Sequence, residues 1–336
     1  MSTNEQKKYD VIFGVYPWAF DCPGGGERQL MAWKSHLEDL GHNVRLYDPW
    51  RPTPEEPKIF HFFSVMPGSY QLCDYLKNKG KHLVITPNLW VTPETKWNYP
   101  HDDIQRLLSI ADRIVVNSSL EAKALSEVYE VALSRFCVVY NGVEQSFFQS
   151  ASPDLFRAWS GLANKRYLLN VANVESRKNQ LRFLEALKDY PDLSLVVVGN
   201  ARDSAYLEKC RQVGKDQFIY VGPVEYGSEL LRSALAGAEA FVMPSTLETP
   251  SIAALEAAAS GCRIMVTEVG STTEYFGKNA IYIDPDSKES MSRGIGQVLQ
   301  MPSECLREHI QHRFTWKNVI KDLEQLYSQL MQESGN

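Results

Sequence analysis

The chain alternates short apolar runs with helix-favouring segments along almost its whole length, and this alternation limits the folds open to it. In the first half the apolar runs are rich in β-branched and aromatic residues, which is typical of strands. Such an order predicts one parallel sheet with helices on both faces. The expected strands are Val11–Tyr16, Asn43–Tyr47, Lys58–Ser64, His82–Thr86, Asp112–Asn117 and Phe136–Tyr140, and the expected helices are Glu27–Leu40, Ile104–Ala111 and Leu120–Tyr129.

The alternation stops between Glu144 and Lys165, where Ser, Pro and scattered aromatic residues replace it. It then resumes, so we predict a domain junction in this stretch and two doubly wound, Rossmann-like α/β domains that face each other across a cleft. The expected second-half strands are Tyr167–Val171, Leu193–Gly199, Phe218–Val221, Ala240–Pro244 and Arg263–Thr267, and the helices are Gln180–Tyr190, Ala205–Val213, Ser228–Ala236 and Ile252–Ser260. The tail from Trp316 to Met331 has apolar residues at helical spacing, which predicts an amphipathic helix packed against another element.

Composition excludes several classes of protein. A net charge of −6 over 336 residues argues against a protein that binds nucleic acid by neutralising phosphates. No apolar run approaches the roughly 20 residues that span a bilayer, and the first ten residues lack the apolar core of a secretory signal. The six cysteines form no C-x-x-C pair, which is typical of a reducing compartment. We therefore predict a soluble, cytoplasmic protein.

Two glutamates lie eight positions apart around a strand-to-helix connection. Glu248 follows the expected strand that ends at Pro244, and Glu256 lies in the next helix, about two turns in, which ends near Gly261. Glu256 has alanines and leucine around it, so we expect it to be buried and to need polar partners. Ligands of open α/β sheets bind beyond the carboxyl ends of the strands, where helix N-termini favour anions. The pattern favours a ligand with phosphates and hydroxyls, such as a sugar nucleotide.

A glycine-rich segment, Pro23-Gly24-Gly25-Gly26-Glu27, follows the first strand and opens the first helix. Glycines at this place let a ligand approach the backbone closely. The dinucleotide fingerprint G-x-G-x-x-G is incomplete because Gln29 occupies its third glycine position, although Asp48 ends the second strand as a ribose-binding acid would. An NAD(P)-dependent oxidoreductase and a purely structural turn both stay open at this point.

Two adjacent cations, Arg177 and Lys178, lie between the first strand and first helix of the second half. Positive charges at a helix start oppose the helix dipole, so they do not serve helix stability. A bound diphosphate explains them, because charge-assisted hydrogen bonds to an anion contribute roughly 1.5–3 kcal/mol each. A solvated charged turn is the alternative.

The order of these motifs resembles that of the family-4 retaining glycosyltransferases, which share the two-domain GT-B fold. The family's paired glutamates match Glu248 and Glu256, and its basic loop matches at Lys178. Other matching segments are the glycine loop Gly25-Gly26-Glu27, Leu40-Gly41-His42-Asn43-Val44, Asn141-Gly142-Val143 and the closing Phe314-Thr315-Trp316. The resemblance implies an acceptor-binding domain at 1–150, a nucleotide-sugar-binding domain at 151–312, and a closing helix at 313–336 that returns to the first domain.

The resemblance also implies roles for individual residues. Glu256 holds the donor's ribose, Glu248 contacts the donor sugar or the reacting phosphate, and Lys178 neutralises the diphosphate. Where the family usually carries an arginine, this sequence has Asn173, so Arg177 stands in for that arginine. Thr249-Pro250-Ser251 replaces the family's usual glycine-aromatic-glycine. The remaining assignments are Gly25, Gly26 and Ile252 on the donor side, and Asn88, at a place where many relatives carry a histidine, with Trp90 on the acceptor side.

The resemblance implies a retaining glycosyltransferase that moves a sugar from a UDP- or GDP-linked donor to a hydroxyl of a glycan or lipid-linked acceptor in cell-surface polysaccharide synthesis. The resemblance implies no metal and no further cofactor. The net charge argues against a nucleic-acid partner, and the lack of a marked cationic amphipathic helix implies at most weak peripheral contact at the inner membrane surface. Two alternatives stay open: a catalytically silent relative that binds sugar nucleotide or glycan, and the oxidoreductase.

Overall fold

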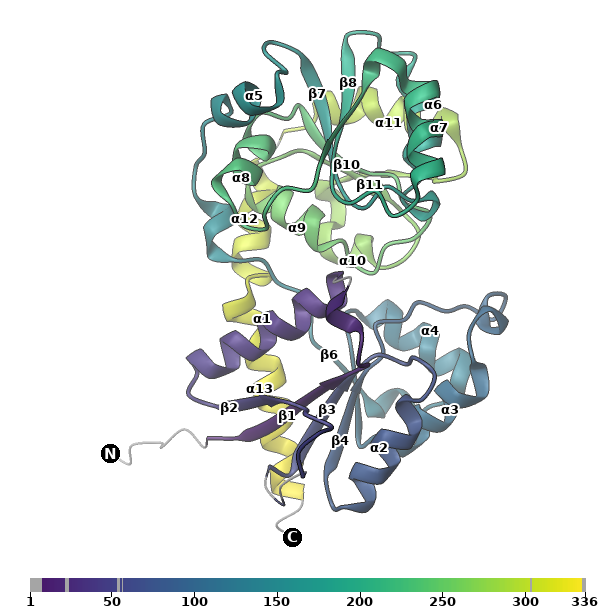
Figure 1. Ribbon diagram of the computed structural model, residues 1–336, viewed down its shortest axis with the longest axis vertical. Coiled ribbons are helices and arrows are strands. Elements are labelled where there is room, and N and C mark those ends of the chain that lie inside the picture. Colours follow the sequence, from purple (N-terminus) through teal and green to yellow (C-terminus); the bar gives the residue numbers. More distant parts are fainter. Residues whose placement is uncertain (1–7, 22–23, 53–54, 56, 303, 334–336) are drawn as a thin grey trace. The chain divides into compact units, whose positions relative to one another are not determined.

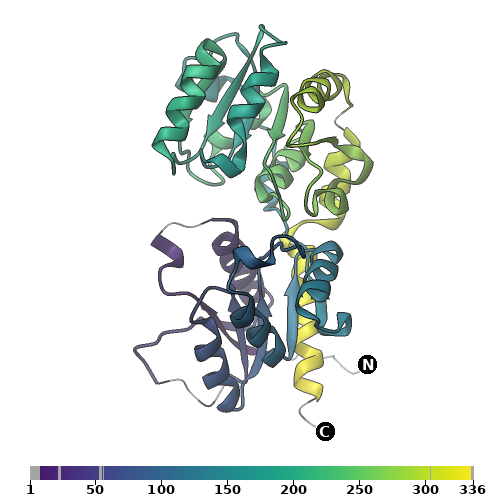
Figure 2. The same ribbon diagram turned by 90° about the vertical axis from the view of Figure 1, so that its right-hand side faces the viewer.

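The computed structural model describes residues 8–21, 24–52, 55, 57–302 and 304–333. The seven N-terminal residues, on which the expectation about a secretory signal partly rests, and Pro23 of the glycine-rich segment lie outside this range. The chain divides into two compact units, residues 1–141 with 316–336, and residues 142–315 (Figures 1 and 2). Each unit is an α/β structure around its own parallel sheet, which confirms the predicted fold class.

In the described part of the first unit, six parallel strands form a sheet in the order β2-β1-β3-β4-β5-β6. The strands are β1 Asp10–Val15, β2 Asn43–Leu46, β3 Ile59–Phe63, β4 His82–Thr86, β5 Arg113–Val116 and β6 Phe136–Val138. The helices are α1 Gly25–Asp39, α2 Ser69–Asn78, α3 His101–Ile110, α4 Ser119–Tyr129 and α13 Trp316–Glu333. Helix α2 has no counterpart among the expected helices; it begins directly after Gly68, whose φ is +91°.

The two faces of the first sheet are covered by different helices. Phe60 and Phe62 of β3 belong to the core formed with α2, α3 and α4, while the alternate residues His61 and Phe63 contact Trp33 of α1. This alternation follows from the period of two along a strand. All five residues of β3 are buried, as expected of a strand covered on both faces.

Helix α13 packs on the first unit even though the whole second unit precedes it in the chain (Figure 1). The expected apolar stripe is buried: Trp316, Val319, Ile320, Leu323, Leu326, Tyr327 and Leu330. His61 lies fully buried in the sheet beneath it; its Nδ1 is 2.6 Å from Tyr327 Oη and its Nε2 is 2.7 Å from Thr86 Oγ1. Burial lowers the pKa of His61 to about 3, so the ring is neutral and structural.

In the described residues of the second unit, six parallel strands follow the order β12-β11-β10-β7-β8-β9. They are β7 Arg166–Val171, β8 Leu193–Val198, β9 Phe218–Gly222, β10 Ala240–Met243, β11 Ile264–Thr267 and β12 Ile281–Ile283. The helices are α5 Asp154–Ser160, α6 Gln180–Leu187, α7 Ser204–Gly214, α8 Glu229–Ala236, α9 Ile252–Ala259, α10 Thr272–Phe276, α11 Lys288–Gln300 and α12 Glu304–Arg313. Strand β12, at one edge of this sheet, and helix α11 are not among the elements that the sequence patterns predict.

Short 3₁₀ turns connect several of these elements, at η1 Ala19–Asp21, η2 Lys96–Asn98, η3 Leu133–Arg135, η4 Gln145–Phe148, η5 Ser176–Lys178, η6 Lys215–Gln217 and η7 Gly277–Asn279. Within the described residues, no helix combines the length and apolar character needed to cross a bilayer.

Candidate functional site

The loop between β10 and α9 places Glu248 at the carboxyl edge of the second unit's sheet. A neighbouring loop fixes the backbone on both sides of this residue: Glu248 N–H donates to Val269 O at 3.1 Å, and Ser271 N–H donates to Glu248 O at 3.0 Å. Gly270 lies between these partners with φ +110°, and a Cβ atom there would sit 2.0 Å from Glu248 O. Only glycine permits this approach, so Gly270 sets the position of Glu248.

Glu248 forms a short ion pair with Lys178, which arrives from the loop after β7. Lys178 Nζ lies 2.6 Å from Glu248 Oε1, and the two side chains are 12% and 7% exposed. Arg177 Nη1 lies 3.9 Å from the same carboxylate oxygen, and its side chain is half exposed. The structure therefore brings together Arg177, Lys178 and Glu248, the residues to which the family resemblance gives roles at the diphosphate and the donor sugar.

The charges around Glu248 decide its ionisation. Burial raises the pKa of this carboxyl, but the ammonium of Lys178, which also donates a hydrogen bond, and the charge of Arg177 outweigh burial and lower the pKa below its usual value. Glu248 is therefore a carboxylate at neutral pH. It cannot donate a proton there, but it can orient Lys178.

Helix α9 begins directly after this loop. Ser251 is its N-cap and accepts a hydrogen bond from Ala254 N–H at 3.2 Å, and Ile252 is the first helical residue. Thr249 is partly buried, while Pro250 is buried and has no backbone N–H to offer a ligand. Thr249, Pro250, Ser251 and Ile252 thus form the connection from Glu248 into the helix.

Helix α9 begins at Ile252, as expected, and Glu256 is its fifth residue, so Glu256 lies just over one turn into the helix and not about two. It is 2% exposed, as its apolar neighbours in the sequence predict. The helix ends at Ala259 with Ser260 as its C-cap, and Gly261 follows with φ +88°, which fits the expected glycine cap.

The loop after β7 is held by side-chain amides. Gln180 Nε2 donates to Asn170 Oδ1 at 3.1 Å and to Asn173 O at 2.9 Å. Asn179, in a left-handed conformation at φ +59°, donates from Nδ2 to Pro244 O at 3.1 Å and to Pro285 O at 2.8 Å. Asn173 therefore contributes its backbone to the loop, and Asn179 ties the Lys178 loop to the end of β10.

Two charged residues beside this cluster have no role in the sequence analysis. Glu175 lies 3.5 Å from Arg177 and 3.9 Å from Arg202, which follows β8. Strands β7 and β8 are neighbours, so their following loops meet at one edge. The spacing of basic residues gave no signal for Arg202, because 24 positions separate it from Lys178.

The first unit holds the remaining candidates. Gly25 and Gly26 are the first two residues of α1, and Glu27 folds back so that its Oε2 accepts from Gly24 N–H at 2.7 Å. Asn88, directly after β4, is exposed and left-handed at φ +50°. A Cβ on Gly26 would lie 3.3 Å from Asn88 Nδ2, so these two loops are close. Trp90 is half-buried two residues further on.

The residues that would support a dinucleotide site are engaged in local structure. Gln29, at the third fingerprint position, is 1% exposed and donates to Asn117 Oδ1 at 2.5 Å. Asp48 accepts from Trp50 N–H at 3.0 Å and pairs with Arg51 at 3.2 Å. Within the part of the chain that the structure describes, no group of three or more His, Cys, Asp or Glu side chains is placed to hold a metal ion.

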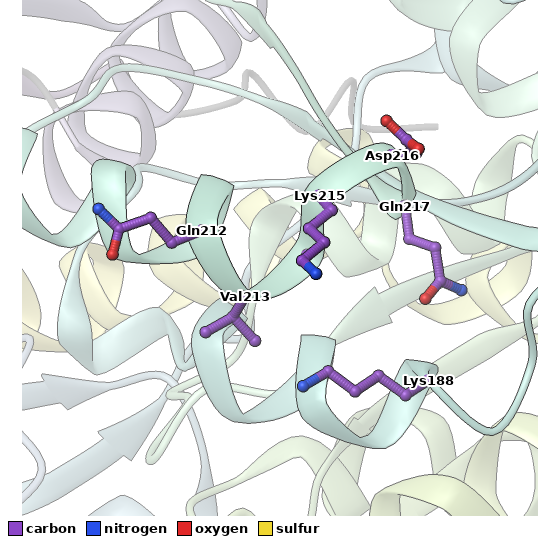
Figure 3. A pocket seen from close by; sticks show the side chains of 7 residues that line it. Lys188, Gln212, Val213, Lys215, Asp216 and Gln217 are labelled. Carbon is purple, nitrogen blue, oxygen red and sulfur yellow. The ribbon is translucent and has the colours of Figure 1, made fainter.

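A surface cavity of about 440 Å³ lies at the opposite, amino edge of the second sheet (Figure 3). It contains none of the candidate residues, and Gln217 closes one side by donating to the backbone oxygens of Leu187, Tyr190 and Leu193. The lining residues are Lys188, Gln212, Val213, Gly214, Lys215, Asp216 and Gln217.

Comparison with known proteins assigns both halves of the chain to glycosyltransferases. Residues 154–314 match the profile "Glycosyl transferases group 1", and residues 53–147 match "Glycosyltransferase Family 4". An uncharacterised glycosyltransferase of Methanocaldococcus jannaschii is 24% identical over 66% of this chain and 61% of its own length. A D-inositol 3-phosphate glycosyltransferase of Corynebacterium urealyticum is 25% identical over 69% of this chain and 60% of its own length. The matched part is thus about three fifths of these curated relatives.

Solved structures show the same fold at low identity. Sucrose-phosphate synthase of Thermosynechococcus elongatus superposes with a TM-score of 0.80 at 17% identity, over 96% of this chain and all of that one. HepE of Anabaena, solved in complex with UDP, superposes with a TM-score of 0.78 at 16% identity, over 95% of this chain and all of its own. With two parallel sheets of the same architecture and both family matches, the chain belongs to the family-4, group 1 glycosyltransferases of the GT-B fold.

Proposed function

We propose that the protein is a retaining glycosyltransferase that moves a sugar from a nucleoside-diphosphate sugar to a hydroxyl of a glycan or lipid-linked acceptor. The observation that carries this proposal is the buried pair of Lys178 and Glu248 at the carboxyl edge of the second sheet. A lysine held by a carboxylate beside a second cation suits an anionic leaving group. The family membership supports a sugar as the transferred group, and HepE, solved with UDP, supports a nucleotide sugar as the donor.

In this proposal the second unit stabilises the departing diphosphate. Lys178 and Arg177 supply positive charge where negative charge develops, and the N-terminus of α9 supplies backbone N–H groups close to Glu248. Glu248 keeps Lys178 in place before the donor binds. Because its pKa is lowered, Glu248 stays ionised and serves in orientation rather than as a proton donor.

Glu256 is the proposed partner of the ribose hydroxyls. It sits in α9 only 2% exposed, and a buried carboxylate is best stabilised by hydrogen bonds to donors such as hydroxyls. Its place one turn from the helix start keeps it near the loop that carries Glu248.

The finer parts of the proposal follow from the family. Retention of the sugar's configuration would follow from front-face attack by the acceptor hydroxyl, with the leaving phosphate accepting its proton. The cationic cluster takes the place of a metal ion, so we propose metal-independent transfer. The acceptor belongs to the first unit, near Asn88 and Trp90, and cell-surface polysaccharide synthesis by a cytoplasmic enzyme is the proposed setting.

Ligand-induced thermal stabilisation tests the proposal directly. The melting temperatures of the wild-type protein and of the Glu256→Ala variant are measured without ligand and with millimolar UDP, GDP, ADP, CDP or NAD. A ligand at 100 times its Kd adds about 2.7 kcal/mol to the free energy of unfolding, which is visible in the Tm. We expect a shift with UDP or GDP that the Glu256→Ala variant loses.

A matched control removes a carboxylate elsewhere in the same unit. Glu208 on α7 is 57% exposed, so Glu208→Ala should keep the nucleotide shift. A shift with NAD alone would favour the oxidoreductase and overturn the proposal. Nucleotide binding without any transfer to a glycan acceptor would favour a silent relative.

A further inference from the structure

The first unit contains a chain of side-chain amides that ends at Asn88. Gln29 of α1, which is 1% exposed, donates from Nε2 to Asn117 Oδ1 at 2.5 Å. Asn141 also donates to Asn117 Oδ1, at 3.3 Å. Asn117, 2% exposed, in turn donates from Nδ2 to Asn88 Oδ1 at 2.9 Å. Three residues that follow β4, β5 and β6 thus meet one residue of α1.

The donor-to-acceptor direction of these hydrogen bonds fixes the orientation of the Asn88 amide. Its Oδ1 faces inward and accepts, so its Nδ2 group is the one left to face away from Asn117. Rotating the Asn88 amide by half a turn would bring two N–H₂ groups together and lose this hydrogen bond. Asn117 is held in the same way, because its Oδ1 receives N–H groups from both Gln29 and Asn141.

The backbone beneath the amides is fixed as well. Glu121, which is fully buried, accepts from Asn117 N–H through Oε2 at 2.8 Å and from Leu89 N–H through Oε1 at 3.3 Å. One carboxylate therefore ties the end of β5 to the residue after Asn88. Asn88 itself has φ +50°, a conformation that costs free energy and is concentrated at functional sites.

We infer that Asn117 and Gln29 are positioning residues that hold Asn88 with its amide N–H groups outward, as a hydrogen-bond donor to an oxygen of a sugar substrate. This inference rests on the proposed function and adds the chemistry of contact: towards the substrate, Asn88 donates a hydrogen bond and accepts none, and it exchanges no proton with the substrate near neutral pH. The small Gly26 beside Asn88 Nδ2 leaves room for a ligand there.

A double-mutant cycle on donor-sugar transfer tests the positioning role. Asn88→Ala should lower kcat/KM about 10-fold, in line with the loss of one hydrogen bond to a ligand. Asn117→Ala should lower it by a smaller factor, and the double variant should be no worse than Asn88→Ala, since Asn117 acts through Asn88. If the two factors multiply, Asn117 has only a structural role and the inference fails.

Two further variants make the result specific. Asn88→Asp can still accept from Asn117 but presents only an acceptor outward, so its kcat/KM should fall at least as far as that of Asn88→Ala. Wild-type activity in this variant would overturn the inference. If Asn117→Ala does not fold, Gln29→Met replaces it in the double-mutant cycle with Asn88→Ala. The control is Asn78→Ala, at an exposed position on α2, which is expected to leave kcat/KM unchanged.

Hydrogen exchange of the side-chain amides tests the orientation without any activity. The N–H₂ protons of Asn117 should exchange slowly and those of Asn88 fast, because only the former are buried in the chain of hydrogen bonds. Slow exchange at Asn88 with fast exchange at Asn117 would overturn the inference even in an inactive protein. Absence of transfer by the wild-type protein, with the exchange as expected, would instead count against the proposed function.

Discussion

The carboxyl edges of the two sheets share one architecture but differ in their side chains, with a cluster of neutral amides at the first edge and a charged cluster at the second. In the first unit, the loops after β4, β5 and β6 meet through neutral amides, with Asn117 at the centre. In the second unit, the loops after β7 and β10 meet through a lysine and a carboxylate 2.6 Å apart. A charged cluster suits an anion, whereas amides suit hydroxyls; under the proposed function the second edge would take the diphosphate and the first edge a sugar hydroxyl.

The largest expected effect comes from removing charge at the second edge. We predict that Lys178→Ala lowers kcat for transfer by about 10²–10³-fold, because the developing charge on the diphosphate loses its most closely held cation. Steady-state kinetics with the donor identified by thermal shift would measure this. Lys188→Ala, a lysine of the same unit that lines the cavity in Figure 3, should leave kcat unchanged. If Lys178→Ala kept the wild-type kcat, Lys178 would not stabilise the leaving diphosphate, and the functional contrast between the two edges would not hold.

The next effect concerns the backbone that positions Glu248. We predict that Gly270→Ala destabilises the second unit by about 2–4 kcal/mol or displaces the Glu248 loop, since the new Cβ would meet Glu248 O at 2.0 Å. Thermal unfolding and nucleotide binding are the measurements. Gly227 also has a positive φ, +67°, but nothing lies within 4 Å of its Cβ position, so Gly227→Ala should cost only about 1 kcal/mol. Equal losses for the two variants would contradict the close-approach argument.

The last effect is a pH dependence in the first unit, which is absent at neutral pH and appears only in acid. The pKa of His61 falls from 6.5 to about 3 in the folded chain, so below pH 6.5 the unfolded chain binds a proton that the folded chain does not. Stability should therefore decrease as the pH falls from about 6 towards 4, by up to about 1.4 kcal/mol per pH unit, and stay level above pH 7. Urea unfolding at several pH values, followed by tryptophan fluorescence, to which Trp33 beside His61 contributes, would measure the slope.

The variant His61→Asn should be less stable at pH 7 because it loses buried contacts, yet its stability should vary less between pH 6 and 4. The exposed His312 in the second unit provides the control, since His312→Asn should keep the wild-type slope. An unchanged slope in His61→Asn would mean that other groups cause the acid sensitivity.

Much of the second edge could be predicted from the sequence because its residues come in short runs. Arg177 with Lys178, and Glu248 through Glu256, each lie in one strand-to-helix connection, and parallel strands bring such connections to one edge. The depth of Glu256 in α9 was overestimated: the helix begins at Ile252, as expected, and Glu256 is its fifth residue, just over one turn in. Glu175 and Arg202 were missed because their pairing depends on the contact between two separate loops.

The sequence by itself determined the two parallel sheets, the apolar stripe of α13 and the family, because strand and helix periods and compact motifs are local properties of the chain. Only the tertiary structure decided that His61 bonds to Tyr327, and that Gln29, Asn88, Asn117 and Asn141 form one chain of amides. Gln29 and Asn117 are 88 positions apart, and no local pattern encodes which buried donor meets which acceptor. Burial imposes that choice, because each polar group removed from water must find its partner within the fold.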